Sequence, residues 1–291
     1  VVVLVLRSVR LQLLVLGAGP GGYAAAFLAA DKGMQVTLVD AGARPGGTCL
    51  HVGCIPSKAV LHAARLITDA REAVHVGVKF APPEIDVNGV RGHWMKVVDT
   101  LSRNLAQLAS ERKVAYVQGR GQFVDRQTVQ VGEARYRFQH CVVATGSVPA
   151  RPGSLDMPGK RVMDSTGALR LEEVPPRLLV VGGGYIGLEV GYMYAALGSK
   201  VTVVELTDGL LPGVDRDLVR PLHRRLEKLF DKIYLKTRVA KLVETPQDVR
   251  VFLEGEGVAE KEPVLSSDCV LVAVGRRPNS QDLGLDKAGV A

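Results

Sequence analysis

Short apolar runs alternate along the chain with glycine-rich turns and amphipathic stretches, and one such arrangement occurs twice. In its first copy, the pattern predicts a strand over Leu11–Leu16, a helix over Tyr23–Lys32 and a strand over Gln35–Val39, which ends at Asp40. Apolar runs bounded by glycine favour strands, and longer amphipathic stretches favour helices. Strands that alternate with helices are typical of βαβ units and of a parallel sheet in an α/β fold.

The second copy has the same order of elements. A strand over Leu178–Val181 is followed by a helix that ends near Leu197 and by a strand over Lys200–Val204, with Glu205 after it. Each copy carries a G-x-G-x-x-G turn between its first strand and its helix, and the acid follows the third glycine at the same distance in both. The glycines are Gly17, Gly19 and Gly22 in the first copy and Gly182, Gly184 and Gly187 in the second.

A turn of this kind, with an acid about 20 residues further on, is typical of a Rossmann-like dinucleotide-binding unit. The first glycine permits the tight turn, the second lets a pyrophosphate approach the backbone, and the third lets the helix pack close to its strand. The helix N-terminus offers amide donors to the phosphates. Glycine turns that bind no nucleotide are the weaker interpretation, because both copies share the spacing.

The two acids indicate which dinucleotides bind. Asp40 and Glu205 are each placed to accept hydrogen bonds from a ribose 2′-hydroxyl. A carboxylate repels the 2′-phosphate of NADP, for which an arginine would be expected, so the second site is predicted to prefer NAD. The first site needs a different dinucleotide, and FAD is the natural candidate.

The rest of the chain predicts one long helix, over about Trp94–Lys113, and several further strands. These strands are Val114–Gln118, Thr128–Val131, Cys141–Ala144, three short segments late in the second copy, and Cys269–Val274. Pro149 and Arg151–Gly153 mark a linker. We therefore predict a connector over residues 1–10, an FAD-binding domain over 11–150, an NAD-binding domain over 151–275, and a return to the first domain over 276–291.

Length and composition exclude several classes of protein. A chain of 291 residues corresponds to about two domains, and 47% hydrophobic with 23% charged residues excludes intrinsic disorder. The net charge of +7 comes from scattered basic residues, and only 5% of residues are aromatic, which disfavours a nucleic-acid partner. The most apolar stretch, Val1–Leu16, is interrupted by Arg7, Ser8, Arg10 and Gln12, so we expect no membrane span.

Two of the four cysteines, Cys49 and Cys54, lie just after the first copy. A structural zinc site needs four ligands, and these thiols with His51 supply three, so we predict no metal site. A redox pair is the better interpretation, because Gly53 can permit the bend of a disulfide and the pair follows an FAD unit. Lys58, one helical turn after Cys54, is placed to stabilise a thiolate; the alternative is a solvated charge on a helix.

In this order, the motifs GAGPGG, GGTCLHVGCIPSK, ATG, GGGYIGLE and VGRRPN resemble those of the pyridine nucleotide–disulfide oxidoreductases. The resemblance extends from about Leu11 to Ala291. The CIPSK ending is most similar to the dihydrolipoamide dehydrogenase branch, the flavoproteins of 2-oxoacid dehydrogenase complexes. Mercuric reductases, with CVPSK, are the next most similar, and glutathione reductases, with CVPKK and arginines for NADP, are less similar. A non-catalytic dinucleotide-binding fragment is a third interpretation.

The resemblance implies an enzyme that oxidises protein-bound dihydrolipoamide and reduces NAD through a Cys49–Cys54 disulfide and FAD. It makes Cys49 the thiol that exchanges with the substrate, Cys54 the thiol against the flavin, Lys58 the lysine beside flavin N5, and Glu189 its acidic partner near the nicotinamide. Further residues fall where the family binds FAD: Gly17, Gly19, Gly22, Asp40, Ala41, Gly46, Gly47, Thr48, Gly121, Ala144, Thr145 and Gly146. Others fall where it binds NAD: Gly182, Gly184, Tyr185, Ile186, Gly187, Glu205, Val239 and Gly275.

The sequence departs from the family pattern in several places. His51 stands where the family usually has Asn, and Asp40 where it usually has Glu. We expect the chain to stop before the second FAD signature and the interface domain, and therefore to be a poorly active fragment that holds NAD better than FAD. The resemblance implies that the full-length enzyme is a homodimer that binds a lipoylated acyltransferase subunit but no nucleic acid or membrane. It also implies a location in the bacterial cytoplasm or the mitochondrial matrix.

Overall fold

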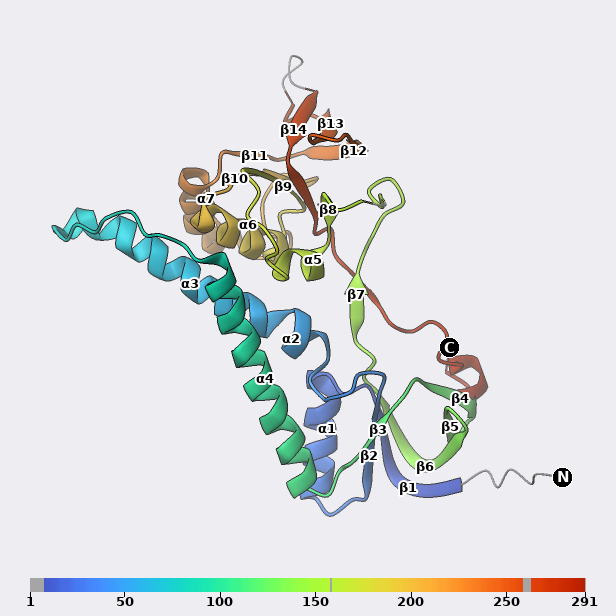
Figure 1. Ribbon diagram of the computed structural model, residues 1–291. Coiled ribbons are helices and arrows are strands. Elements are labelled where there is room, and N and C mark those ends of the chain that lie inside the picture. Colours follow the sequence, from blue (N-terminus) through green and yellow to red (C-terminus); the bar gives the residue numbers. More distant parts are fainter. Residues whose placement is uncertain (1–7, 158, 259–262, 291) are drawn as a thin grey trace. The chain divides into compact units, whose positions relative to one another are not determined.

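The computed structural model of this protein describes residues 8–157, 159–258 and 263–290 (Figure 1). These residues form two compact units. The first comprises the chain up to Ile55, Lys96–Val148 and the chain from Pro278 onward, and the second comprises Pro56–Met95 and Pro149–Arg277. By its contacts Pro56–Met95 thus belongs to the second unit, although the sequence pattern groups it with the first. The assignment of a cofactor to each domain stays a prediction.

The first unit is built on a six-stranded sheet in the order β3-β2-β1-β6-β5-β4. The four strands β3, β2, β1 and β6 are parallel, and β5 and β4 continue the sheet as antiparallel strands. The strands are β1 (Ser8–Leu16), β2 (Val36–Asp40), β3 (Ala115–Gln118), β4 (Gly121–Asp125), β5 (Thr128–Val131) and β6 (Ala134–Val143).

Residues of β1 alternate between two cores of the first unit. Leu13 and Val15 pack in the cluster that includes helix α1 (Pro20–Asp31), whereas Leu14 and Leu16 pack with residues of β4, β5 and β6. This alternation follows from the two-residue period of a strand. The central strand is therefore apolar on both faces, as in parallel sheets generally.

The second unit repeats the plan of the first. Its five-stranded parallel sheet has the order β11-β10-β9-β15-β8, and a three-stranded antiparallel sheet, β12-β13-β14, follows β11 in the chain. The strands are β8 (Val162–Met163), β9 (Arg177–Val181), β10 (Lys200–Val204), β11 (Lys232–Tyr234), β12 (Thr237–Glu244), β13 (Val249–Gly255), β14 (Val264–Ser267) and β15 (Cys269–Val272). The order β11-β10-β9-β15 corresponds to β3-β2-β1-β6, so the repeat in the sequence is a repeat in the fold.

Helices and short strands complete the two units. The remaining elements are α2 (Gly47–Val52), α3 (Cys54–Glu72), a 3-10 helix η1 (Ala73–Val76), α4 (Val87–Glu111), β7 (Ser147–Pro149), α5 (Ser165–Leu169), α6 (Tyr185–Leu197), α7 (Arg216–Leu229), β16 (Arg276–Pro278) and α8 (Leu285–Ala288). The strands β7 and β16 pair with each other.

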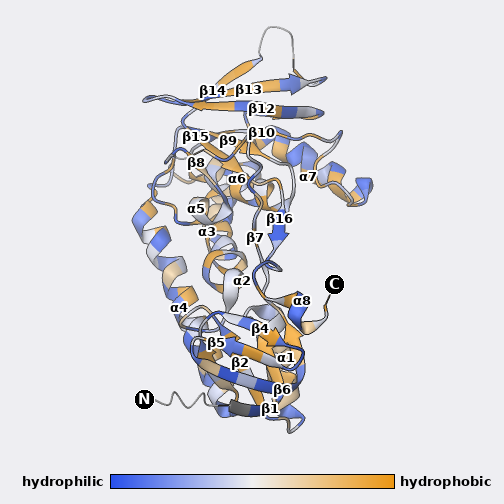
Figure 2. Cartoon of the chain, turned by 90° about the vertical axis from the view of Figure 1, so that its right-hand side faces the viewer, coloured by the Kyte–Doolittle hydropathy of each residue, from blue (hydrophilic) through white to orange (hydrophobic). Residues whose placement is uncertain are grey.

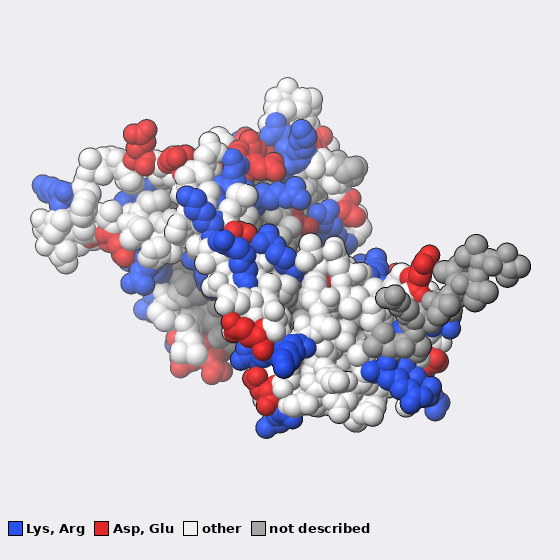
Figure 3. Space-filling model, turned by 60° about the horizontal axis from the view of Figure 1, so that its bottom comes forward, with Lys and Arg blue, Asp and Glu red and all other residues white. Residues whose placement is uncertain are grey.

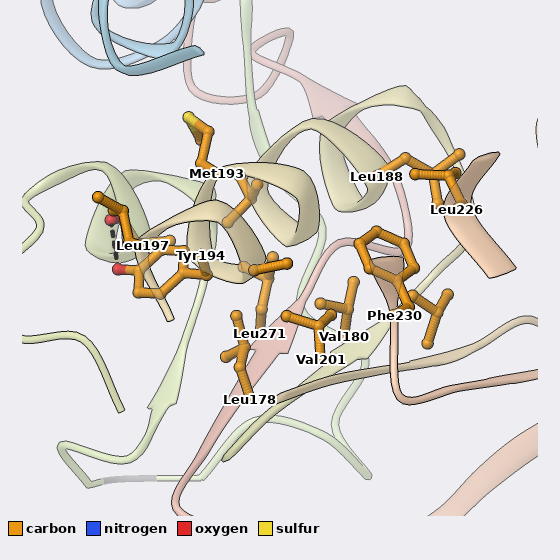
Figure 4. Packing of buried hydrophobic residues seen from close by; sticks show 14 of the residues in the cluster. Leu178, Val180, Leu188, Met193, Tyr194, Leu197, Val201, Leu226, Phe230 and Leu271 are labelled. Carbon is orange, nitrogen blue, oxygen red and sulfur yellow. Dashed lines mark hydrogen bonds between the residues drawn. The ribbon is translucent and has the colours of Figure 1, made fainter. Parts of the chain in front are cut away.

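The main core of the second unit lies between its parallel sheet and α6 (Figure 4). Val180 and Leu271 on the strands pack with Met193 and Tyr194 on the helix. The Tyr194 hydroxyl donates to the carbonyl oxygen of Ala168 at 2.8 Å, so its burial leaves no donor unpaired. In Figure 2, apolar residues accordingly predominate on strands of this sheet, whereas α7 alternates polar and apolar residues.

Several predicted boundaries need correction. β1 begins at Ser8, so the predicted connector is partly strand, and Val1–Arg7 lie outside the described residues. α4 begins at Val87 rather than near Trp94, because Gly89 and Gly92 are accommodated inside the helix. The sequence pattern also omits β4, whose alternation of exposed polar and buried apolar residues is only five residues long.

On the face shown in Figure 3, basic side chains are interspersed with acidic ones and with uncharged areas. Among the described residues, no helix combines the length and the apolar character that crossing a membrane requires.

Candidate dinucleotide and dithiol sites

The first glycine-rich turn joins β1 to α1 at the carboxyl edge of the parallel strands. Gly17 has a φ of +102°, and a Cβ at this position would lie 2.2 Å from the carbonyl oxygen of Ala144. A Cβ on Gly22 would lie 1.7 Å from the carbonyl oxygen of Gly17. Only glycine fits at either position, so α1 starts directly on the turn. No side chain caps the helix at Gly19, which leaves its first amides available to an anion.

The second turn reproduces this geometry between β9 and α6. Gly182 has a φ of +109°, and a Cβ there would lie 2.4 Å from the carbonyl oxygen of Ala273. A Cβ on Gly187 would lie 2.1 Å from the carbonyl oxygen of Gly182, whereas one on Gly184 would meet nothing within 4 Å. No side chain caps α6 either. The open space at Gly184, beside uncapped helix amides, fits the pyrophosphate of a dinucleotide.

The acids at the ends of β2 and β10 are both bonded to backbone amides. Asp40 accepts from the amides of Ala18 at 2.6 Å and Gly42 at 2.7 Å. Glu205, which is only 6% exposed, accepts from the amides of Gly183 at 2.6 Å and Thr207 at 2.7 Å. In each unit the acid therefore fixes the second residue of the glycine-rich turn, a role that the sequence pattern does not indicate.

Two hydroxyl groups near these acids also escape the sequence analysis. The Thr207 side chain lies 2.8 Å from Oε1 of Glu205 and 2.9 Å from the carbonyl oxygen of Gly209. Tyr116 donates to the carbonyl oxygen of Gly42 at 2.8 Å and so holds the segment that follows Asp40. Burial, followed by the negative charge of Asp40, raises the pKa of Tyr116 to about 12. Thr207 could have been found from the sequence, because it lies two positions after Glu205. Tyr116 could not, because it lies on β3, far from Asp40 in the chain.

The cysteine pair is attached to the first glycine-rich turn. The amide of Gly46 donates to the carbonyl oxygen of Ala18 at 2.8 Å, and a Cβ on Gly47 would lie 2.6 Å from the Cα of Gly19. These contacts place the start of α2, the helix that carries the half-buried Cys49, against the turn.

Gly53 lies between α2 and α3, whose first residue is the exposed Cys54. A Cβ on Gly53 would lie 2.9 Å from the carbonyl oxygen of Thr48 and 3.4 Å from the Cα of Cys49. The chain thus folds back onto Cys49 immediately before Cys54. That the two sulfur atoms come within disulfide distance stays a prediction.

Lys58 and Glu189, predicted as partners, form an ion pair inside the second unit. The Lys58 ammonium lies 2.7 Å and 2.8 Å from the two carboxylate oxygens of Glu189, on α6. The hydroxyl of Ser57 adds a contact of 3.4 Å to the same carboxylate. With a Lys58 side chain that is 60% exposed, this pair adds little stability. Its position one helical turn after Cys54 is more informative than its energy.

The remaining predicted residues are spread over several loops, strands and helices. Ala144 and Thr145 follow β6, and the Thr145 hydroxyl donates to the carbonyl oxygen of Asn279 at 2.7 Å. Gly121 starts β4 under Leu16, where a Cβ would lie 2.6 Å from the leucine side chain. The other predicted positions are exposed or partly exposed, except for Gly46 and Val239, which are buried: Ala41, Gly46, Thr48, Gly146, Tyr185, Ile186, Val239 and Gly275.

The other two cysteines lie in strands of the two parallel sheets. Burial raises the pKa of Cys141, on β6, to about 12. Burial and the nearby carboxylate of Glu173 raise the pKa of Cys269, on β15, to about 11. Both thiols are therefore protonated at neutral pH.

Comparisons with known proteins place the chain in one family. Residues 11–291 match the family model described as pyridine nucleotide-disulphide oxidoreductase. The dihydrolipoyl dehydrogenases of Vibrio cholerae and Haemophilus influenzae are each 40% identical to this chain, and the alignments cover 98% of the chain and 60% of each relative. The chain thus spans about 60% of the length of these curated relatives.

The chain is also similar to a solved structure. The Cu(II) complex of the HOCl-induced flavoprotein disulfide reductase RclA from Escherichia coli matches with a TM-score of 0.79 and 28% sequence identity, over 97% of this chain and 60% of that protein. The family match over residues 11–291 includes both glycine-rich turns and the cysteine pair described above. This chain belongs to the pyridine nucleotide-disulphide oxidoreductase family.

Proposed function

We propose that this chain is part of a dihydrolipoyl dehydrogenase, which oxidises the dihydrolipoyl group of an acyltransferase subunit in a 2-oxoacid dehydrogenase complex and reduces NAD. The observation that carries the proposal is the attachment of the Cys49 helix to the first glycine-rich turn, through Gly46 and Gly47. It holds the helix that carries Cys49 against the glycine-rich turn, and a protein that only binds nucleotides needs no thiol there. The relatives named dihydrolipoyl dehydrogenase support the choice of substrate.

The dithiol chemistry uses Cys49 and Cys54 as a disulfide that is reduced and re-formed. One substrate thiolate attacks the Cys49 sulfur and Cys54 leaves as a thiolate; the second substrate thiol then displaces Cys49 and closes the lipoyl disulfide. The substrate loses two electrons and two protons; the cysteine pair takes up both electrons and one proton, as one thiol and one thiolate, and the other proton passes to solvent. Cys54 is the first residue of α3, and this position favours the cycle because helix N-termini stabilise thiolates.

The residues around the two turns fit FAD and NAD. Gly17, Gly19 and Asp40 would hold FAD in the first unit, and Gly182, Gly184 and Glu205 would hold NAD in the second. Bound FAD supplies two-electron transfer between the thiols and NAD. Lys58, fixed by Glu189, supplies a positive charge one helical turn after Cys54. In the full-length protein we propose a homodimer as the active form.

The test compares Cys49→Ser and Cys54→Ser in the full-length protein with the unmodified enzyme. We expect each substitution to abolish NAD reduction by dihydrolipoamide while bound flavin is retained. Cys269→Ser serves as the control, because this buried thiol lies outside the dithiol and its loss should leave the rate unchanged. Undiminished turnover in Cys49→Ser, or turnover with oxidised glutathione and NADPH but none with dihydrolipoamide, would refute the proposal.

A further inference from the structure

A pocket of about 330 Å³ lies in the second unit, and none of its lining residues belongs to either glycine-rich turn. It is formed where α3, α6 and α7 meet. The lining residues are Thr68, Glu72, Tyr192, Pro221, Arg224, Arg225, Lys228 and Leu229. Three of these are cations and one is an acid, so the pocket carries a net positive charge.

The single acid is already neutralised. Arg225 lies 3.1 Å from Glu72, and a hydrogen bond with Tyr192 followed by the charge of Glu72 raises the pKa of this arginine. Tyr192 in turn donates to the Thr68 hydroxyl at 3.0 Å. These contacts hold one wall of the pocket in place, and Arg225 balances the charge of its one acid, Glu72.

Arg224 and Lys228 are the two cations that remain. They lie one turn apart on the exposed side of α7, and they form no ion pair with any carboxylate in the described parts of the chain. Like charges at this spacing repel each other. An anion with two negative charges between them would remove that repulsion and accept from both side chains.

The walls also select the class of anion. Pro221, Leu229 and the Tyr192 ring are apolar, and the volume exceeds what a lone phosphate group fills. Arginine binds planar and tetrahedral oxyanions through paired donors, which suits a phosphate. We propose that this pocket binds the phosphate group of a small phosphorylated molecule, with Arg224 and Lys228 as ligands and the apolar wall against the rest of the molecule.

The experiment titrates the purified chain, saturated with NAD, with AMP, inorganic phosphate and inorganic pyrophosphate. Calorimetry gives the affinities, and backbone amide shifts in the 15N-labelled chain show whether α7 responds. We expect shifts over α7 and at least a tenfold loss of affinity in the double variant Arg224→Ala, Lys228→Ala. Tighter binding of AMP than of inorganic phosphate would support the proposal, whereas equal binding would show that the apolar wall contributes nothing and would overturn the proposed class of ligand.

A matched control removes the same charge elsewhere in the second unit. The double variant Arg220→Ala, Lys241→Ala also loses two exposed cations, but neither residue lines the pocket. This control should bind as the unmodified chain does. Equal weakening in both double variants would show attraction by net charge only and overturn the proposal. The absence of shifts on α7 would overturn the proposal as well. So would a control titration in which sulfate and malonate bind the chain as tightly as AMP does.

Discussion

Single carboxylates at the ends of β2 and β10 combine two roles. Both Asp40 and Glu205 were selected from the sequence by their distance from a glycine-rich turn, and the sequence suggests only a ribose ligand. The structure adds that each accepts from the second amide of its own turn, in Ala18 and Gly183. That contact depends on how the turn closes over the strand end, and no spacing rule contains this information.

Replacing the second acid should therefore weaken NAD binding in two ways. In Glu205→Gln the carboxamide cannot accept from both Gly183 and Thr207 as the carboxylate does, and the charge toward the ribose is lost. We expect NAD binding to weaken by about 1–3 kcal/mol, measured by titration calorimetry. Asp208→Asn is the control, since it removes the same charge from an exposed neighbour. Equal affinities for all three proteins would show that Glu205 does not hold the nucleotide.

The thiols should divide into two classes in an alkylation experiment at pH 8. A pKa of about 12 for Cys141 and about 11 for Cys269 leaves at most about one thiolate in a thousand, so neither should react in minutes. After reduction we expect iodoacetamide to label Cys54 and Cys49, and after oxidation neither of them. Peptide mass spectrometry identifies the sites. Labelling of Cys54 in the oxidised chain would contradict the proposed disulfide.

At the scale of elements, strands with continuous apolar runs were predictable and strands of two or three residues were not. The predicted strands over Leu178–Val181 and Lys200–Val204 agree with β9 and β10 to within one residue. These strands are buried on both faces, so their apolar runs are unambiguous. By contrast, β7, β8 and β16 contain two or three residues each, and their pairing partners rather than their own sequence make them strands.

The junction of β1 with α1 gives a sharp prediction for two adjacent glycines. Gly22→Ala should destabilise the first unit by about 3 kcal/mol, because its Cβ would lie 1.7 Å from a backbone oxygen and must displace the helix. Gly21→Ala, whose Cβ would only touch Ala144 at 4.0 Å, should be neutral or stabilise by about 1 kcal/mol. Urea denaturation compares the two. A similar loss in both would mean that the close approach of helix and strand is not what Gly22 provides.

Asp268, just before β15, accepts hydrogen bonds from Arg177 at the start of β9, and the stabilising effect of these bonds should depend on pH. Asp268 accepts from the amide of Arg177 at 2.8 Å and from its guanidinium at 2.8 Å and 3.1 Å, which lowers the pKa of Asp268 below 3.8. Its stabilising effect is therefore present above about pH 4 and disappears as the pH falls through the lowered pKa.

Asp268→Asn should cost about 1 kcal/mol at pH 7, since Arg177 is partly exposed and solvent screens the pair. The difference in unfolding free energy between the two proteins should shrink as the pH falls from about 4 through the lowered pKa of Asp268. Urea denaturation at several pH values measures it. A difference that stays constant from pH 7 to pH 3 would show that the charge of Asp268 contributes nothing.

At the scale of the whole molecule, the repeat in the sequence predicted two dinucleotide units, and the fold contains two parallel sheets with corresponding strand orders. The pattern did not predict that Pro56–Met95 belongs to the second unit. The helical periodicity of this segment shows that it has an apolar face, but not against which core that face packs. Val60 and Ile67 of α3 enter the main core of the second unit. Which core an apolar helix face packs against is decided by tertiary contacts, and a periodic sequence pattern does not contain them.

The division into units also predicts how the two sites respond to substitution. Asp40 and its amide partners lie entirely in the first unit, and Glu205 and its partners entirely in the second. Effects at sites without shared partners add to within about 0.5 kcal/mol. In the full-length protein, Asp40→Asn should therefore weaken FAD retention and leave the NAD affinity unchanged, and Glu205→Gln should do the reverse. Flavin absorbance after gel filtration and NAD calorimetry give both quantities for the single variants and the double variant. If Asp40→Asn weakens NAD binding as much as Glu205→Gln does, the two turns act as one site, and the assignment of one dinucleotide to each unit is wrong.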